Sequence, residues 1–328
     1  MEDVKVSISC IAYNQEDYIA DAIESFLMQK TNFKYKVLIH DDASTDKTAE
    51  IIKEYEKKYP DIIKGVYQSE NQYSKGVKVT TTFLAPLYLG KYVAVCEGDD
   101  YWTDENKLQK QYDYMESHPE CNLCVHGSVE VKADTKSVLS ISNLSDKLEE
   151  YDIIDAIKGL GRNVATNSFF CRKEYRKMTP EFMRIAPCGD YVLPILCAKD
   201  GGKIVYLPYV MSAHRAMAKS SITESWQKNY DKLKKYCERF DKMLDALDEY
   251  TDYKYSEYVK TEKVRNWSIF YLRTRNKKKL KEEPYKSYIK SAPKKIRFRR
   301  FLNVYFPFVI SFLRKVKHII LDFKVRQG

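Results

Sequence analysis

Apolar runs that suit buried strands alternate with helical patterns along the first part of the chain. Residues 4–12 form a strand-like run, and the segment ending near residue 29 has apolar side chains at i, i+3, i+4, i+7 and i+8. The alternation continues through expected strands at 36–40, 63–68 and 92–96 and expected helices at 79–89 and 104–117. A further helix is expected between the strands at 36–40 and 63–68; Ser44, Thr45 or Asp46 can cap it, and it runs toward Pro60. This order predicts an α/β fold with right-handed βαβ units and a mostly parallel, mixed sheet flanked by helices.

Acidic residues follow two of these expected strands. An acid pair at 41–42 ends the second strand, and Glu97, Asp99 and Asp100 end the fourth. Carboxylates so close together repel one another unless a hard divalent cation such as Mg²⁺ or Mn²⁺ lies between them. The ends of parallel strands are also where open α/β sheets bind ligands. The alternative is a solvated acidic turn in which Asp104 caps the next helix.

Two common nucleotide-binding motifs are absent from the sequence. No G-x-G-x-x-G follows the first expected strand, and no P-loop lysine motif occurs. The first absence argues against a dinucleotide-binding Rossmann domain. The acid residues, rather than glycines, are therefore the features that predict the ligand site.

The net charge of +10 is unevenly distributed. Residues 226–328 carry 28 Lys and Arg against 12 Asp and Glu, whereas residues 1–225 carry 28 against 34. An acidic first part does not fit a nucleic-acid-binding protein. The change in charge coincides with a change to long, charged helical patterns, and it predicts two domains, 1–225 and 226–328.

Cysteine usage predicts a reducing compartment. The chain opens without an apolar signal segment, and eight Cys without such a signal favour free thiols in the cytoplasm. Cys121 and Cys124 form a CxxC pair without a second pair at zinc-site spacing. We therefore expect them to lie in an ordinary strand over 121–131.

The second half of the first domain alternates less regularly. We expect strands at 168–171 and 203–206 and a helix at 190–198. From residue 227 the pattern is helical, and a heptad seam shorter than three heptads predicts packing against the first domain rather than an independent coiled coil. The seam consists of Tyr230, Leu233, Cys237, Phe240, Leu244 and Leu247.

The C-terminal tail, residues 294–324, interleaves basic residues with Phe, Tyr, Leu and Ile. Such a segment can lie in the interface of an anionic membrane. The alternative is a helix that buries its apolar side on the protein. The longest nearly apolar run, residues 301–313, is too short for a simple transmembrane span.

Three motifs in this order resemble the nucleotide-sugar-dependent, inverting glycosyltransferases of family 2. They are SISCIAYNQEDYIADAIESFLMQ, VLIHDDASTDKTAEII and VAVCEGDDYWTDENKL. The resemblance covers residues 4–215 and implies the GT-A fold, with the helical extension following it. It also implies a nucleotide-diphosphate sugar as donor, UDP-linked by expectation, and Mn²⁺ or Mg²⁺ as cofactor.

The resemblance implies a nucleotide site at the ends of the first two strands. Tyr13 is expected to stack on the base and Asp42 to accept a hydrogen bond from it, while Asp41 holds the loop or has a purely structural role. Asp99 is expected to contact the ribose or the donor sugar. Arg215 and Lys219 are expected to meet the diphosphate. The remaining expected nucleotide-binding residues are Ala12, Asn14 and Glu16.

The resemblance also implies the metal site and the catalytic base. Asp100 is expected to be the direct metal ligand, with Asp99 beside it, and Asp190 occupies the position of the base. The other reading of Asp190 is an N-cap of the following helix. Relatives often carry Arg-x-His after the last core strand. Here His214 precedes Arg215, and it is a substitute metal ligand, a phosphate contact or an ordinary histidine.

Two smaller departures from the family pattern are visible. Glu97 stands where the family usually has the first Asp of its D-x-D motif, and its longer side chain predicts an indirect role. Ala43 replaces a common Gly, and we expect this to cost little.

The expected function is therefore metal-dependent, inverting transfer of a sugar to a hydroxyl acceptor in cell-surface polysaccharide synthesis. The acceptor is a saccharide or a lipid-linked saccharide, and the location is cytoplasmic, peripheral on the inner face of the plasma membrane. Two alternatives stay open. One is a nucleotidyltransferase that makes sugar nucleotides, although the loop after the first strand lacks the Gly-rich, basic sequence expected for it. The other is a non-catalytic nucleotide-binding scaffold.

Overall fold

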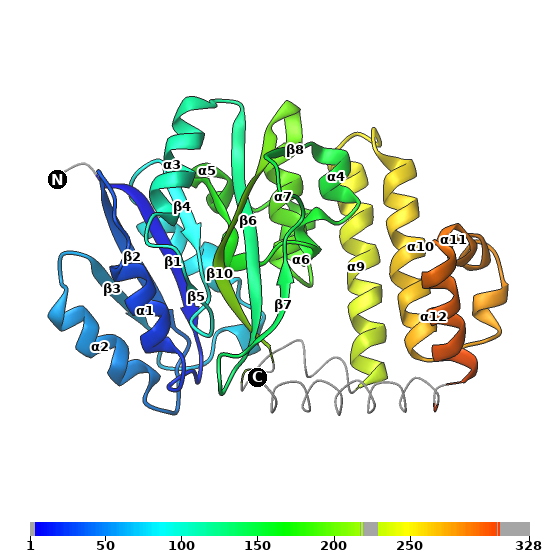
Figure 1. Cartoon of the computed structure of the whole chain (residues 1–328), viewed down its shortest axis with the longest axis horizontal. Helices are drawn as coiled ribbons and strands as arrows, with labels where there is room; N and C mark the ends of the chain where they lie inside the picture. Colours follow the sequence, from blue (N-terminus) through cyan, green and yellow to red (C-terminus); the bar gives the residue numbers. More distant parts are fainter. Residues whose placement is uncertain (1–3, 217, 219–228, 307, 309–328) are drawn as a thin grey trace, which may run out of the picture. The chain divides into compact units, whose positions relative to one another are not determined.

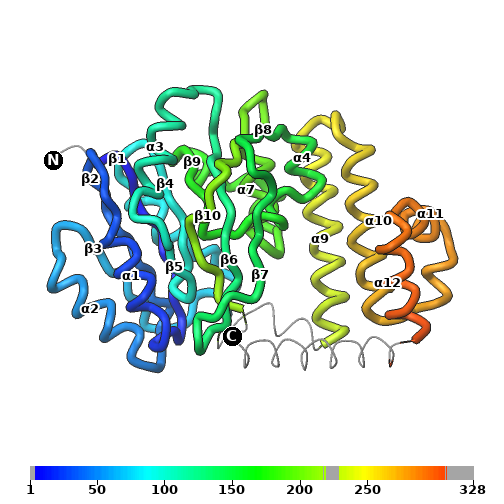
Figure 2. Tube along the Cα trace, in the orientation of Figure 1, coloured from blue at the N-terminus to red at the C-terminus, as the bar shows by residue number. Residues whose placement is uncertain are grey.

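A computed structural model of the chain describes residues 4–216, 218, 229–306 and 308. The chain divides into two compact units, Met1–Ser225 and Trp226–Gly328. Each unit is described by itself. Figures 1 and 2 follow the chain through both.

The first unit is built on one mixed sheet with the strand order β3-β2-β1-β4-β9-β6-β10-β5. Strands β3, β2, β1 and β4 are parallel to one another, as are β6 and β10, whereas β9 and β5 are antiparallel to their neighbours. The bounds are β1 Val4–Ala12, β2 Lys34–Asp41, β3 Ile63–Tyr67, β4 Tyr92–Val95, β5 Tyr101–Trp102, β6 Cys121–Lys132, β9 Phe170–Arg172 and β10 Lys203–Ala216. β7 (Val138–Ser142) pairs with β6, and β8 (Glu149–Tyr151) pairs with β10.

Helices flank this sheet, as the predicted α/β class requires (Figure 1). Their bounds are α1 Ile19–Leu27, α2 Thr48–Lys58, α3 Lys107–Ser117, α4 Ile153–Ile157, α5 Lys173–Lys177, α6 Glu181–Ile185 and α7 Gly189–Ala198. Alternate residues of β4 face different layers: Tyr92 and Ala94 belong to the core that holds Phe26 of α1 and Met115 of α3. All four residues of β4 are buried, which explains why its sequence is continuously apolar rather than alternating.

Two expected elements differ from the observed ones. Residues 79–89 do not form one helix but a π-helical turn, Thr80–Leu84, and a 3₁₀ turn, Ala85–Leu87. Pro86 lacks the N–H that an α-helix needs at that position, and its ring would clash with the preceding turn. The strand expected at 203–206 continues to Ala216, because shifts of the β6–β10 register between Leu207 and Ser212 absorb the Pro208 interruption.

The strand expected around the CxxC pair is present as β6. Cys121 and Cys124 are both buried and unbridged, and they point into the core. All eight Cys are free thiols.

The second unit consists of helices: α9 Tyr230–Tyr250, α10 Ser256–Arg273, α11 Tyr285–Ser291 and α12 Lys294–Tyr305. Helices α9 and α10 pack against each other, and α11 and α12 both pack on α10. Along the expected heptad seam, Leu233, Cys237, Phe240, Leu244 and Leu247 are buried, and Tyr230 at the start of α9 is exposed. No helix among the described residues is long and apolar enough to cross a membrane.

Ala43, which follows β2, has a φ of 60° in the left-handed region. That conformation costs an L-residue about 1–2 kcal/mol, which is partly offset because Gly loses more entropy on folding. We expect Ala43→Gly to raise the free energy of unfolding by about 0.5–1 kcal/mol in urea titrations. Ala49→Gly, a change inside α2, is the matched control and should lower it by a similar amount. A destabilised Ala43→Gly protein would contradict the assignment.

Candidate functional site

The loops after β1 and β2 are joined by a series of hydrogen bonds. Ala12 and Asp41 are paired at the ends of the two parallel strands, so the loops leave the sheet side by side. The backbone N–H of Asn14 donates to Ser44 Oγ (2.9 Å), and Asn14 Oδ1 accepts from the Thr45 N–H (2.8 Å). These contacts stabilise Asn14, whose φ of 51° is unusual for a residue other than glycine.

The other expected nucleotide-binding residues of these loops lie beside Asn14. Tyr13 is 38% exposed, so its ring is accessible to a ligand, whereas Ala12 is buried. Glu16 accepts a hydrogen bond from the Lys47 N–H (3.1 Å), and its own N–H donates to Asp46 (3.1 Å). Glu16 therefore ties the first loop to the start of α2.

Asp42 is 5% exposed, and both of its carboxylate oxygens accept backbone hydrogen bonds. The donors are the N–H groups of Gln72 (2.8 Å) and Tyr73 (3.0 Å). Asp42 therefore connects the end of β2 to the segment after β3. Asp41 accepts from the Ser44 N–H (3.2 Å), which fits the expectation that it holds the loop.

The acidic loop, residues 97–100, is held against the end of β10 by strand β5. Tyr101 pairs with Ala213 and Trp102 with Ser212, so Asp100 lies opposite His214. His214 Nδ1 is 3.1 Å from both carboxylate oxygens of Asp100. The side chain of His214 is 51% exposed and that of Asp100 only 1%. The structure thus brings two of the expected metal ligands together, with Asp99 adjacent in the same loop.

Arg215 differs from its expected role. Its guanidinium has no exposed surface; it donates to the backbone oxygen of Asp99 (2.7 Å) and forms an ion pair with Asp21. Its backbone N–H donates to Asp100 (2.9 Å). A group buried in this way cannot meet a diphosphate without leaving these partners, so Arg215 supports the acidic loop instead. Lys219, its expected companion, lies outside the described residues.

Asn167 is a site residue that the sequence analysis missed. It is fully buried, and its Nδ2 donates to Asp100 Oδ2 (2.9 Å) and to the Ala213 oxygen (3.0 Å). Its Oδ1 accepts from Ser212 Oγ (2.7 Å), and its backbone oxygen accepts from Trp102 Nε1 (2.9 Å). Asn167 therefore links Asp100 and β10 through its side-chain amide and β5 through its backbone oxygen, and no local pattern around residue 167 signals this.

A buried side chain of α3, Gln111, binds the backbone next to Asn167. Gln111 Nε2 donates to the backbone oxygens of Ser168 (2.9 Å) and Cys124 (3.1 Å), and its Oε1 accepts from Lys107 Nζ (2.8 Å). The ammonium of Lys107 lies 4.0 Å from the centre of the Trp102 ring. Burial lowers the pKa of Lys107 to about 7.

Burial and neighbouring negative charges raise the pKa values of Glu97 and Asp99 in the acidic loop. Burial raises the pKa of Glu97 to about 8 and that of Asp99 to about 6, and the charge of Asp100 adds to both shifts. The hydrogen bond to Asp100 raises the pKa of His214 to about 9. At neutral pH the imidazole is therefore protonated and donates to Asp100. It must lose that proton before it can ligate a metal.

Asp190 lies in the first turn of α7, and its Oδ1 accepts from the Tyr191 N–H (2.9 Å). Cys188, rather than Asp190, is the N-cap residue. Burial raises the pKa of Asp190, and its charge in turn contributes to the raised pKa of Glu97. Asp190 is therefore close enough to the acidic loop for their charges to interact.

The carboxylates of the acidic loop suit a hard cation that is coordinated jointly by protein carboxylates and by a substrate phosphate. Among the described residues, no three His, Cys, Asp or Glu side chains are grouped so that they could hold a metal ion by themselves. Mg²⁺ and Mn²⁺ prefer oxygen ligands, and Mg²⁺ is often bound through one or two carboxylates together with substrate phosphates. Carboxylates whose repulsion raises their pKa values are suited to such a shared site.

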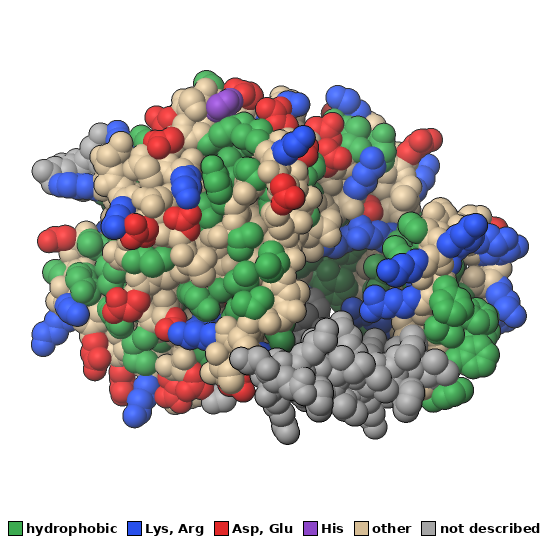
Figure 3. Space-filling model, viewed as in Figure 1, with side chains coloured by type: hydrophobic (Ala, Val, Ile, Leu, Met, Phe, Trp, Pro, Cys, Tyr) green, Lys and Arg blue, Asp and Glu red, His purple; other side chains and the backbone are tan. Residues whose placement is uncertain are grey.

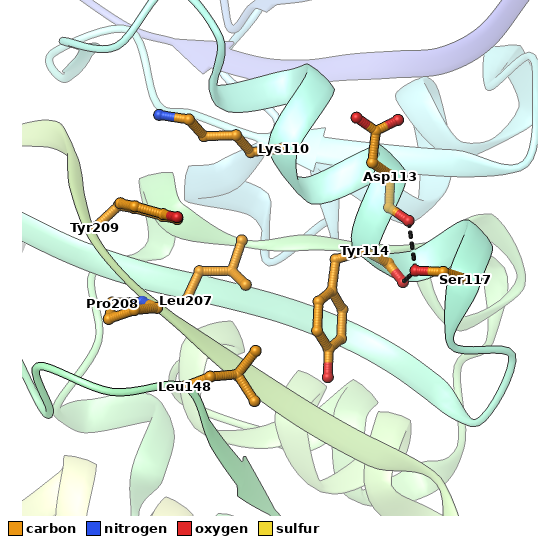
Figure 4. Close-up of a pocket in the computed structure, with 8 residues that line it drawn as sticks. All are labelled: Lys110, Asp113, Tyr114, Ser117, Leu148, Leu207, Pro208 and Tyr209. Carbon is orange, nitrogen blue, oxygen red and sulfur yellow. Dashed lines mark hydrogen bonds between the residues drawn. The ribbon is translucent and has the colours of Figure 1, made fainter.

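A hollow of about 420 Å³ lies elsewhere on this unit, between α3 and β10 (Figure 4). Its lining contains none of the residues of the acidic loop. The residues drawn are Lys110, Asp113, Tyr114, Ser117, Leu148, Leu207, Pro208 and Tyr209. This hollow is therefore separate from the candidate site.

Comparison with known proteins identifies the family. The model of glycosyl transferase family 2 matches residues 7–177. An uncharacterised protein of Mycobacterium tuberculosis is 36% identical over 236 residues, which are 71% of this chain and 64% of that relative. The chain thus covers less than two thirds of that relative's length. The chain belongs to glycosyl transferase family 2, as its three motifs predict.

Two further comparisons concern an enzyme and a solved structure. The Escherichia coli enzyme named UDP-Glc:alpha-D-GlcNAc-diphosphoundecaprenol beta-1,3-glucosyltransferase WfaP is 35% identical over 112 residues, 34% of this chain and 41% of that protein. The mannosyltransferase PcManGT of Pyrobaculum calidifontis, solved with GDP-Man and Mn²⁺, superposes with a TM-score of 0.56 at 13% identity. The superposition covers 94% of this chain and 88% of that one, and it confirms the predicted GT-A fold.

Replacement of Asn167 tests whether this amide positions the acidic loop. Asn167→Asp keeps the shape but places a carboxylate against Asp100, and we expect it to lower the free energy of unfolding by about 2 kcal/mol or more. Asn163→Asp, an exposed change four residues earlier, is the control and should stay within about 0.5 kcal/mol. Urea titrations measure both. Equal stability of the two variants would contradict a role for Asn167.

The raised pKa values predict that the metal-free protein loses stability as the pH rises. Glu97 has a pKa of about 8 in the folded protein against an ordinary value of 4.5, and His214 has about 9 against 6.5. These two groups therefore bind more protons in the folded state than in the unfolded chain, so their contribution to stability decreases with pH across these intervals. In EDTA we expect the thermal midpoint of the wild type to fall relative to that of Glu97→Gln between about pH 5 and 8, a comparison that cancels the opposite contribution of Lys107.

Addition of Mn²⁺ should reverse this trend. Because a cation takes the place of the bound protons, its stabilising effect should increase toward the upper end of the pH range. The same measurement with Mg²⁺ in place of Mn²⁺ tests a second divalent cation. A metal effect that is largest at low pH would contradict the assignment.

Proposed function

We propose that the protein is a metal-dependent, inverting glycosyltransferase that moves a sugar from a nucleotide-diphosphate donor to a hydroxyl acceptor. The observation that carries the proposal is the acidic loop, which is fixed beside His214 at the ends of the parallel strands. Family membership and the name of the E. coli relative support a UDP-sugar as donor. The PcManGT complex supports a nucleotide sugar together with Mn²⁺.

The loops after β1 and β2 form the nucleotide side of this proposed site. The exposed ring of Tyr13 is available to stack on the base, while Asn14, Glu16 and Asp42 keep the loop conformation that presents it. Ala12 supplies the end of the strand beneath the base. Direct recognition of the base by Asp42 stays a prediction, because each of its oxygens already accepts a backbone N–H.

Within the acidic loop we assign different roles to the neighbouring acids. Asp99 is partly exposed, and none of the other described residues donates a hydrogen bond to its carboxylate. We therefore assign Asp99 as the carboxylate that is more available to a metal. Asp100 is buried against Asn167 and the Arg215 N–H, and its accessible side faces His214. A bound Mn²⁺ or Mg²⁺ would neutralise the leaving diphosphate.

Asp190 is the proposed general base. The acceptor hydroxyl oxygen forms a bond to the anomeric carbon as the bond from that carbon to the diphosphate oxygen breaks, and the hydroxyl proton passes to the Asp190 carboxylate. Burial raises the pKa of this carboxylate, which makes it a better proton acceptor when ionised. Direct attack in one displacement inverts the anomeric centre, and the transition state resembles that of glycoside hydrolysis.

The acceptor is proposed to be a saccharide or lipid-linked saccharide of a cell-surface polysaccharide. The E. coli relative is named for a diphosphoundecaprenol-linked acceptor, and this name motivates the choice. No observation favours a nucleotidyltransferase, and family membership argues against it. A non-catalytic scaffold would bind a nucleotide without turnover, so the activity assay below separates it from the enzyme.

Replacement of Asp190 by Asn tests the base. The amide keeps the shape of the side chain but cannot accept the proton, so we expect kcat for sugar transfer to fall by about 10²–10⁴-fold while Mn²⁺-dependent binding of UDP is retained. Asp152→Asn, which alters an N-cap at the start of α4, controls for loss of a helix-terminal acid. Wild-type-like turnover by Asp190→Asn would exclude the base role.

Replacement of Asp99 by Asn tests the metal site in the same assay. Loss of the freer carboxylate should raise the Mn²⁺ concentration needed for half-maximal UDP binding and turnover by about tenfold or more. A panel of UDP-, GDP- and dTDP-sugars then identifies the donor. If nucleotide binding by the wild type were independent of Mn²⁺ and Mg²⁺, metal dependence would be rejected.

A further inference from the structure

The second unit carries exposed aromatic side chains along helix α12. Phe298 is 64% exposed, Phe301 48%, and Phe306 just after the helix 41%. Ile296 is also exposed. Several large apolar side chains exposed to solvent within one short helix indicate an interaction surface rather than a core.

The position of α12 explains why these side chains point outward. Val304 is the buried residue of α12, and α12 packs on α10 of the same unit. Phe298, Phe301 and Tyr305 follow at i, i+3 and i+7, which places them on one face of the helix. The rings of Phe301 and Tyr305 stack with their centres 4.9 Å apart, so the aromatic face is continuous.

Cations surround this aromatic face. Lys294, Lys295, Arg297 and Arg299 are all exposed on the same helix. Between Arg273 and Arg300 the chain has thirteen Lys and Arg against two acids, Glu282 and Glu283. Figure 3 shows hydrophobic side chains of this unit gathered beside Lys and Arg over α11 and α12. We call Phe298, Phe301, Phe306 and these four cations the aromatic–basic face.

The combination of rings and cations selects among possible partners. A polyanion such as nucleic acid is attracted by the cations, but it gives exposed Phe and Ile no apolar medium. The interface of an anionic bilayer satisfies both, because cations meet the lipid phosphates while rings enter the headgroup region. The alternation of the two residue types within one helix therefore favours a lipid surface.

We propose that the aromatic–basic face binds the surface of an anionic membrane. Helix α12 would lie along the bilayer, with Phe298 and Phe301 entering the headgroup region and the flanking cations contacting the phosphates. Such a surface would keep the enzyme near a lipid-linked acceptor. The binding itself does not depend on catalysis, so it can be tested independently of the proposed function.

The experiment measures binding of the full chain to vesicles of phosphatidylcholine, with and without phosphatidylglycerol, in the absence of nucleotide. The charge variant is K294Q/K295Q/R297Q/R299Q and the aromatic variant is F298S/F301S. At low salt we expect the charge variant to bind anionic vesicles on the order of a hundredfold more weakly. The aromatic variant should bind on the order of tenfold more weakly.

The matched control is K232Q/K234Q/K235Q/K254Q, which removes the same charge from exposed positions of the same unit outside the aromatic–basic face. It should keep most of the vesicle binding, and circular dichroism should show that all variants are folded. Equal losses in control and charge variant would overturn the proposal, as would equal binding to both kinds of vesicle.

Two further outcomes separate the membrane from other partners and from the activity. If F298S/F301S bound vesicles as tightly as wild type and heparin competed fully, the face would be a polyanion site, and the membrane proposal would fail. Hydrolysis of the sugar nucleotide in solution should be unchanged in both surface variants. Vesicle binding with no hydrolysis in any protein would contradict the proposed enzyme but not this surface.

Discussion

The hydrogen bonds to the Asp100 carboxylate are the contacts on which the proposed site depends. Asp100 follows a strand of only four residues, and its carboxylate is almost fully buried beside two other acids. Such an anion is tolerated only when donors surround it. Asn167 and the adjacent residues His214 and Arg215 of β10 supply these donors, so they come from two segments that are both distant from Asp100 in the sequence. The acidic loop is therefore a product of the whole sheet rather than of its local sequence.

The donors to Asp100 also determine which acid is available to a ligand. Asp100 is held by these donors, whereas Asp99 and Glu97 are partly exposed residues. Burial and neighbouring negative charges raise the pKa values of their carboxyl groups. A protonated His214 compensates part of this charge in the metal-free protein. Metal binding and proton release are therefore coupled, which makes the loop responsive to pH and to the cation at the same time.

The first half of the fold and the acidic positions could be predicted from the sequence because their signals are local. Tyr92–Val95 is a continuous apolar run that the acidic loop follows after one residue, and Val4–Ala12 alternates apolar residues with Lys5, Ser7 and Ser9. Where a local signal was misleading, the cause is proline: Pro86 divides an expected helix, while Pro208 conceals the length of β10. The family resemblance added roles for Asp99, Asp100 and Asp190 that composition and spacing alone do not assign.

The contacts between distant segments could not be predicted, and Arg215 shows why. In the sequence it is a cation next to a histidine after a strand, a setting that suits contact with a diphosphate. In the structure, the two-residue pairing of β5 with β10 turns its side chain inward, where Asp21 of α1 and the Asp99 oxygen neutralise and bind it. A pairing so short has no sequence period of its own, since alternation needs at least four residues to be visible. The same pairing brings Asn167 to Asp100. The buried role of Arg215 and the role of Asn167, neither of which was predicted, therefore have one physical origin.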